Sequence, residues 1–111
     1  MNFEQEKTGP VAIITLAEET FEAAMVEDFS RHMAPIIEEN THVVFDLSHI
    51  RFLDSMACGA LLKCHRKLKD KGGKMGLCCA QKQVKAVFDL MGFPQLFDVF
   101  NDRKEALRAY R

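Results

Sequence analysis

The 111-residue sequence predicts an α/β domain with a mixed, mostly parallel sheet of four to five strands and about four helices. First, β-branched and apolar runs alternate with stretches whose apolar residues recur every three or four positions. Second, a Gly–Pro turn joins the first two strand-like runs, which indicates one antiparallel hairpin. Third, the later strands alternate with helices, and such connections give right-handed parallel crossovers. The length fits one domain, so residues 1–111 are interpreted as a single unit.

The first elements are predicted as a hairpin and a helix. Residues 3–6 form a short edge strand, and the "KTGP" turn leads into the β-branched strand 11–16, "VAIITL". Residues 21–40 form an amphipathic helix. Pro35 is expected to bend this helix or end it early, because proline cannot donate the backbone hydrogen bond of that turn. The apolar stripe that predicts the helix consists of Phe21, Met25, Phe29, Met33, Ile36 and Ile37.

The middle of the chain predicts a central strand and a second helix. The run 42–47, "HVVFDL", lacks alternation, as expected for a strand covered on both faces. A helix then begins at Ser55 and ends before Gly72 and Gly73. Its inward residues are predicted to be Cys58, Leu61, Leu62, His65 and Leu68.

The last third predicts two more strand–helix pairs. "KMGLCCA", residues 74–80, is a strand, and residues 81–92 form a helix that ends at a glycine. "LFDVF", residues 96–100, is a short final strand. The closing helix, residues 102–110, begins with aspartate and carries glutamate three positions later, which resembles a capping box. The inward residues of helix 81–92 are predicted to be Val84, Val87, Phe88 and Met91.

Composition excludes several classes of protein. A hydrophobic content of 48% with 28% charged residues is typical of a folded globular chain. No apolar run approaches the roughly 20 residues of a membrane span, so no membrane insertion is expected. The acidic, polar start lacks the features of a signal peptide, which favours the cytoplasm. The net charge of −1, and a basic run at 63–74 without interleaved aromatics, give no reason to expect direct nucleic-acid binding.

The four cysteines are predicted to be buried free thiols. Cys78 and Cys79 are adjacent, and adjacent residues of a strand point to opposite faces, which disfavours a disulfide or a shared metal ion. No CxxC or HxxxH spacing occurs. We therefore expect no metal and no cofactor. One alternative is a thiol enzyme or redox sensor that uses Cys58 near a helix start, where a thiolate is favoured.

Catalytic motifs are absent. The sequence contains no GxGxxG, GxxxxGK[ST], GxSxG or HExxH. Glu18 and Glu19 are interpreted as a solvated acidic corner, and the four histidines lie in separate predicted elements. The sequence therefore predicts a binding protein and not an enzyme, with no catalytic residue.

Ser55 stands at the start of the helix, directly after Asp54. A serine there often caps the helix by accepting an amide hydrogen bond. Asp54 can supply that cap instead, which leaves the Ser55 hydroxyl available for modification. The surrounding "HIRFLDSMACG" is unusually apolar for a surface loop, and exposed apolar residues around one hydroxyl indicate a surface that is bound by a partner.

From Val43 onward the sequence resembles the STAS domain, particularly the single-domain bacterial anti-sigma factor antagonists. A strand ends in Asp-Leu-Ser, an aromatic residue follows in a short loop, and Asp-Ser opens a helix with small residues. Two departures stand out: Met56, Ala57 and Cys58 replace the usual Ser-Gly-Leu, and Phe21 lies roughly where the family often has an aspartate. The matching positions are Asp46, Leu47, Ser48, Phe52, Asp54, Ser55, Gly59 and Leu61, followed by Gly72–Gly73 and Val87–Phe93.

The resemblance implies a partner-switching regulator of transcription. Ser55 would be phosphorylated by a serine kinase that is also an anti-sigma factor, and restored by a phosphoserine phosphatase. The unmodified protein would sequester the kinase and free a sigma factor. A homo-oligomer is also compatible with the sequence. Expected partner-binding residues are Ser48, Ile50, Phe52, Asp54, Ser55 and Met56, with Asp46 and Gly59 as structural residues of the helix start. The alternative within the family is a constitutive adaptor or scaffold, in stress-signalling or transporter-associated assemblies, that phosphorylation does not switch.

Overall fold

The computed structural model describes residues 1–111 and contains a five-stranded sheet, as the sequence predicts. The strands lie in the order β1-β2-β4-β6-β7, and only the β1–β2 pair is antiparallel. The predicted hairpin and the central position of residues 42–46 are therefore confirmed. The strands are β1 (Phe3–Thr8), β2 (Val11–Leu16), β4 (His42–Asp46), β6 (Lys74–Cys78) and β7 (Asp98–Phe100).

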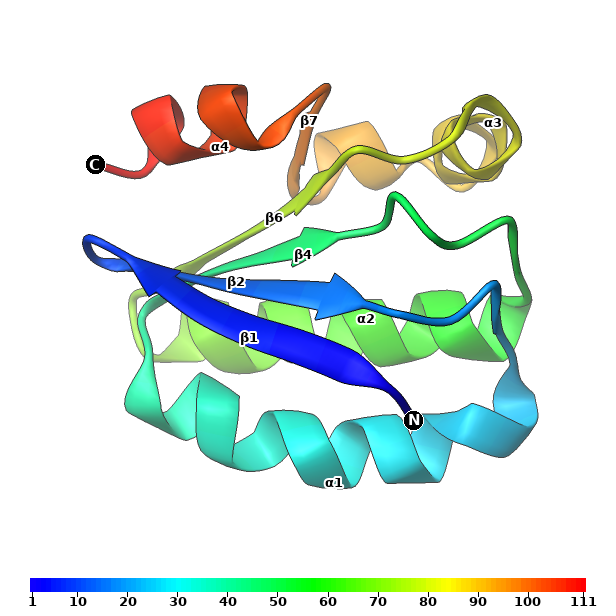
Figure 1. Ribbon diagram of the computed structural model, residues 1–111, viewed down its shortest axis with the longest axis horizontal. Helices are drawn as coiled ribbons and strands as arrows, with labels where there is room; N and C mark the ends of the chain where they lie inside the picture. Colours follow the sequence, from blue (N-terminus) through cyan, green and yellow to red (C-terminus); the bar gives the residue numbers. More distant parts are fainter.

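Four α-helices surround the sheet, so the predicted number is confirmed. Helices α1 and α2 pack against each other under one face of the sheet and begin at the same end of the molecule, whereas α4 lies over the other face (Figure 1). The helices are α1 (Ala23–Glu39), α2 (Ser55–Asp70), α3 (Lys82–Leu90) and α4 (Arg103–Ala109), with a 3₁₀ turn η1 at Phe93–Gln95. None of them combines the length and apolar composition that crossing a membrane requires.

A second, two-stranded parallel sheet joins β3 (Thr20–Phe21) to β5 (Phe52–Leu53). The sequence did not predict it, because two-residue strands carry no periodicity. The prediction that Phe21 opens the first helix is wrong: Phe21 is extended, and α1 starts at Ala23. This pairing brings the segment before α1 against the segment before α2.

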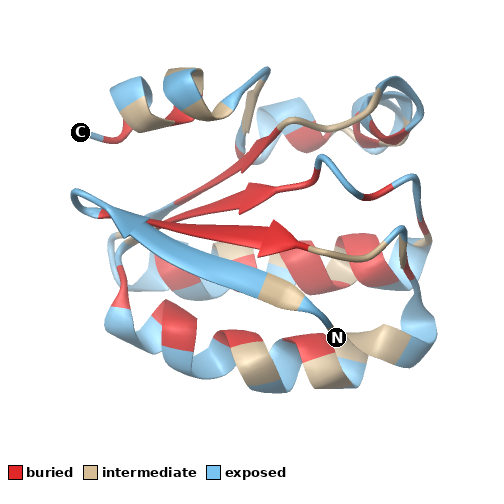
Figure 2. Ribbon diagram, viewed as in Figure 1, coloured by how far each residue is buried: buried red, intermediate tan, exposed pale blue.

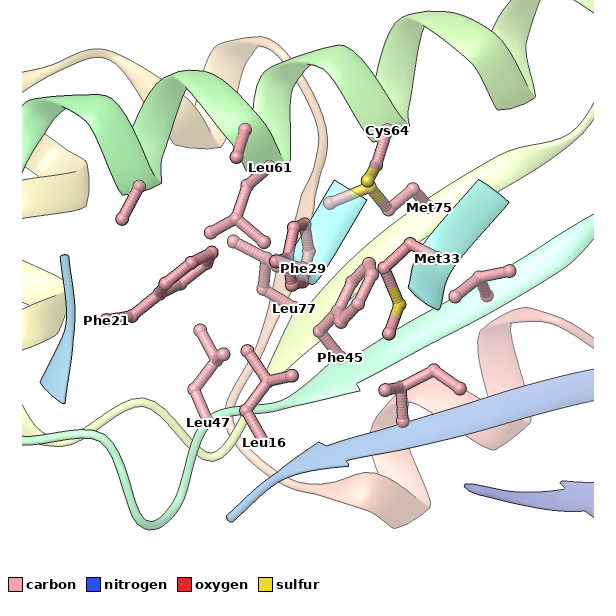
Figure 3. Close-up of a cluster of buried hydrophobic side chains, with 14 of the residues drawn as sticks. Leu16, Phe21, Phe29, Met33, Phe45, Leu47, Leu61, Cys64, Met75 and Leu77 are labelled. Atoms are coloured by element: carbon pink, nitrogen blue, oxygen red, sulfur yellow. The ribbon is translucent and has the colours of Figure 1, made fainter. Parts of the chain in front are cut away.

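The hydrophobic core is divided by the sheet. The larger cluster lies between the sheet, α1, α2 and α3, and includes Phe21, Phe29, Phe45 and Leu61 (Figure 3). A smaller cluster between the sheet and α4 contains Val11, Ile13, Val44, Cys78, Ala106 and Tyr110. Strands β2 and β4 are buried along most of their length, while edge strand β1 is exposed (Figure 2).

Pro35 does not end α1 early; the helix continues to Glu39, next to the end of the predicted range 21–40. Two structural features explain this. Ile36 and Ile37 beyond the proline are buried in the core. In addition, Lys71 Nζ donates hydrogen bonds to the carbonyls of Ile37, Glu38 and Asn40, at 2.7, 2.7 and 3.1 Å. These bonds satisfy carbonyls that a helix end leaves without partners.

The predicted inward faces of two helices need correction. In α2, Leu62 and His65 are only half-buried, whereas Ala57, Ala60 and Cys64 are buried. Met91 was predicted to face inward but is exposed. The reason is that α3 ends at Leu90 and the chain turns through Gly92 at φ +73°, which takes Met91 off the helical face.

Candidate functional site

The candidate site lies at the common end of α1 and α2, and Asp54 organises it. Asp54 is the N-cap of α2, and its Oδ1 accepts a hydrogen bond of 2.9 Å from the amide of Ala57. Its Oδ2 accepts a second bond of 2.9 Å from the amide of Ala23, the first residue of α1. Glu22, the N-cap residue of α1, makes no side-chain cap of its own. One carboxylate therefore caps two helices.

Electrostatics at Asp54 agree with this double cap. The amide of Ala57, followed by that of Ala23, holds the pKa of the Asp54 carboxyl below its usual value. The carboxylate is thus ionised at neutral pH, and its negative charge lies at the positive ends of two helix dipoles. The start of α2 is thereby fixed relative to α1.

Ser55 is the first residue of α2, and its side chain is exposed to solvent. Because Asp54 supplies the cap, capping does not require the Ser55 hydroxyl. The sequence left two interpretations open, a capping serine and a displayed serine. The geometry supports the second: a hydroxyl on a rigid helix start, accessible from outside.

Two large apolar side chains flank this serine on the surface. Phe52 is 53% exposed and Met56 is 58% exposed. Both were predicted as partner-binding residues, and both are placed where a partner can reach them. Ile50 is different, because its side chain is 1% exposed, and neighbouring Leu53 is also buried. The prediction that Ile50 contacts a partner is therefore wrong for this conformation: its side chain belongs to the core.

The remaining predicted residues lie nearby with different roles. Ser48 is exposed; its amide donates to Asp46 Oδ1 at 2.9 Å, and its carbonyl accepts from Gln81 Nε2 at 2.9 Å. Asp46 and Gly59 were predicted as residues of the helix start, and that description needs correction. Asp46 is the last residue of β4, where its carboxylate ties the following turn. Gly59 lies inside α2, and open space surrounds the position of a Cβ there.

Phe21 packs in the core behind the start of α2, where Ser55 lies. Its backbone carbonyl accepts a hydrogen bond of 3.2 Å from the amide of Asp54. Its ring is fully buried and packs on Phe29, with ring centroids 4.7 Å apart. The side chain that replaces the family's frequent aspartate thus points into the core, and no carboxylate at this position lies beside Ser55.

Cys58 does not have the environment of a reactive thiol. Its side chain is completely buried. Burial, followed by the negative charge of Asp54, raises the pKa of the Cys58 thiol to about 11. A thiolate is therefore disfavoured despite the nearby helix start, which argues against the redox interpretation.

The fold and the site define a small α/β domain that displays one serine between exposed apolar residues at the start of a central helix. The chain belongs to the STAS domain family, whose model matches residues 2–106.

Curated relatives and a solved structure agree with this assignment. The chain is 27% identical over 66 residues to the anti-sigma F factor antagonist of Paenibacillus polymyxa, covering 60% of this chain and only 56% of that protein. It is 27% identical over 90 residues to the putative anti-sigma factor antagonist BtrV of Bordetella bronchiseptica, covering 80% and 78%. The phosphorylated form of the Bacillus cell fate determinant SpoIIAA superimposes with a TM-score of 0.74 at 21% identity, covering 99% and 100% of the two chains.

Proposed function

We propose that this domain is a bacterial anti-sigma factor antagonist whose binding to an anti-sigma factor with serine-kinase activity is abolished by phosphorylation of Ser55. The observation that carries the proposal is that Asp54 and Ser55 have separate roles at the start of α2. Asp54 caps the helix, so capping does not need the Ser55 hydroxyl, and Ser55 is exposed to solvent. The names of the two curated relatives, and the phosphorylated state of the SpoIIAA structure, support the same interpretation.

The binding surface in this proposal is centred on Ser55 and includes Phe52, Met56, Ser48 and Asp54. Phe52 and Met56 provide exposed apolar area that a partner can bury. Hot spots of protein interfaces are often aromatic side chains near the centre of the contact. The hydroxyl lies within this apolar surface, so the partner covers it on binding.

Phosphorylation would act on binding and not on folding. A phosphoserine carries a charge of about −1.5 to −2 and lies here at a helix N-terminus, where the dipole favours negative charge. The change in domain stability is therefore small, within about 1 kcal/mol. In the complex the same dianion would lose its water without a paired cation, which costs several kcal/mol. Since each 1.4 kcal/mol corresponds to a tenfold change in affinity, the complex would dissociate.

The test compares defined forms of the protein. Wild type, Ser55→Ala, Ser55→Asp and protein carrying genetically encoded phosphoserine at 55 serve as baits for native cell extract, and retained proteins are identified by mass spectrometry. The matched control is Ser30→Asp, which places the same charge on an exposed serine of α1. We expect a kinase-type partner on wild type, Ser55→Ala and Ser30→Asp, weaker capture on Ser55→Asp, and none on phosphoserine 55. A phosphatase is the expected partner of the phosphorylated form.

Two results would contradict the proposal. Equal capture by the wild type and phosphoserine 55 would favour a constitutive adaptor. A large drop in the melting temperature on phosphorylation would mean that the hydroxyl is primarily structural.

A further inference from the structure

A second group of chemically active side chains lies on the opposite side of the sheet from the core beneath α1 and α2. Asp46 ends β4 and Cys78 ends β6, and these two residues are register partners in neighbouring parallel strands. Both are buried, and Cys78 belongs to the cluster beneath α4. In open α/β sheets, ligands bind at the carboxyl ends of the strands.

The backbone conformation of Cys79 brings a third side chain into this group. Cys79 follows the end of β6 with φ +62°, and it is the one non-glycine residue of the chain with positive φ. The expectation that adjacent cysteines point apart assumed an extended backbone, and it is wrong here. The left-handed conformation places Cys79 Sγ 3.5 Å from Cys78 Sγ. A side chain other than glycine, asparagine or aspartate adopts this conformation at a cost of about 1–2 kcal/mol. Such a local strain often marks a functional position.

We propose that Asp46, Cys78 and Cys79, here called the sulfur–carboxylate cluster, bind a thiophilic divalent cation of the zinc type. One ligand atom from each of the three residues lies within 4.8 Å of the other two. Around tetrahedral zinc, with Zn–S bonds of about 2.3 Å, neighbouring sulfur atoms are about 3.8 Å apart. The observed Sγ–Sγ distance of 3.5 Å is close to that edge. The carboxylate oxygen lies within 4.8 Å of both sulfur atoms, so the ion would have to draw the three ligand atoms closer together.

Arg103 holds the carboxylate ligand in position. Its Nε donates to Asp46 Oδ2 at 2.7 Å, while the Ser48 amide donates to Asp46 Oδ1 at 2.9 Å. Each carboxylate oxygen has a further lone pair for a metal ion. Hydrogen bonds of this kind orient ligands in metal sites and are important for affinity.

The ion would compensate the charge of its ligands. Binding of one M²⁺ ion releases the two thiol protons and leaves two thiolates beside the Asp46 carboxylate, a total of −3. The ion and the Arg103 guanidinium together supply +3. Arg103 also pairs with Glu6, but that carboxylate is exposed to solvent, so the buried charges of the occupied site are compensated, which is the condition under which they are tolerated.

Access and coordination number indicate a reversible site. Cys79 is half-buried, so an ion can enter from its side. Three protein ligands leave the fourth position of a tetrahedral ion to water, unlike the four-ligand sites that are purely structural. The cluster also lies on the α4 side of the sheet, separate from Ser55, so the proposal does not depend on phosphorylation.

The test uses the full chain, kept reduced and free of metal, and titrated with Co²⁺, Cd²⁺ and Zn²⁺. We expect one equivalent to bind, with a sulfur-to-metal charge-transfer band for Co²⁺ and Cd²⁺ and a rise in melting temperature with Zn²⁺. The decisive variant is Cys79→Ser, because this half-exposed residue tolerates the change better than buried Cys78. Loss of one ligand should weaken Cd²⁺ binding at least about tenfold. The matched control, Cys64→Ala, removes a thiol from the other core and should leave the band and the affinity unchanged.

Three outcomes of the Cd²⁺ titrations would overturn the proposal: Cys79→Ser binds Cd²⁺ like wild type, Cys64→Ala loses the band, or micromolar Cd²⁺ produces no charge-transfer band in folded wild type. A wild-type protein that binds trivalent arsenic but neither Cd²⁺ nor Zn²⁺ would contain a dithiol site that does not use the carboxylate, and this result would also contradict the proposal. Circular dichroism of each variant establishes that the compared proteins are folded.

Discussion

Phe21 and Phe52 lie in the two paired strands β3 and β5, where Phe21 is opposite Leu53 and Phe52 is opposite Thr20, yet the structure predicts that the two phenylalanines matter for different properties. Phe21 is fully buried and packs against Phe29 with the rings tilted, whereas Phe52 is 53% exposed. We predict that Phe21→Ala destabilises the domain, while Phe52→Ala leaves stability nearly unchanged and weakens binding of the kinase partner. The same substitution at neighbouring positions thus separates folding from binding.

The magnitude for Phe21→Ala follows from its burial. Truncation of a buried phenylalanine costs about 3–5 kcal/mol, because transfer free energy is lost and a cavity remains. For a domain of this size, each kcal/mol lowers the melting temperature by about 4 °C, which gives a decrease of about 15 °C. Phe52→Ala removes a half-exposed ring, and surface substitutions change stability by about 0.5 kcal/mol. Its expected change in melting temperature is therefore a few degrees at most.

The assay is urea unfolding of the two variants and the wild type, monitored by circular dichroism, together with calorimetric titration of the identified partner. With m of about 2 kcal/mol/M, Phe21→Ala should shift the midpoint down by about 2 M. Phe21→Leu leaves a smaller cavity than Phe21→Ala and should therefore cost less stability than the alanine variant. Equal loss of stability in the two alanine variants would refute the reasoning, as would unchanged partner affinity in Phe52→Ala.

Three further predictions concern close packing, charge and thiol reactivity. Gly73→Ala should destabilise the domain by about 1–3 kcal/mol, because the added Cβ would lie 2.2 Å from a backbone carbonyl oxygen. Gly59→Ala, at an open position within a helix, should stabilise the domain by about 0.5–1 kcal/mol. Urea midpoints of the two variants that move in the same direction would contradict this prediction. The pKa of Asp54 is lowered by folding, so its charge stabilises the fold above the unfolded pKa of about 3.9, and this contribution is lost as the pH falls through the folded value. The melting temperature of Asp54→Asn should accordingly be lower than that of the wild type at pH 7, and the difference between the two should become smaller towards pH 2. A difference that does not change with pH would exclude the charge effect. In native protein a thiol reagent should modify half-exposed Cys79 before buried Cys58, with mass spectrometry as the readout, and the reverse order would show that the chain opens at α2 first.

The architecture was accessible from the sequence because it depends on local patterns. The strand 11–16 was predicted with correct bounds, and the central strand was recognised from an unbroken apolar run. The start of α2 was predicted at Ser55, since a capping residue followed by apolar periodicity is a local signal. The family, too, was recognisable from a continuous motif around that helix start.

The tertiary structure decided which side chains meet across the sequence. Asp54 caps a helix 31 residues earlier, and Lys71 closes the other end of the same helix, although neither bond has a local signal. Ile50 faces the core because the β3–β5 pair, also invisible in the sequence, turns the loop inward. At Cys79 a single backbone angle replaced the expected alternation and brought two sulfur atoms together. Sequence periodicity reports the average environment of an element, whereas these contacts depend on backbone dihedrals and on the approach of distant segments, which only the folded chain defines.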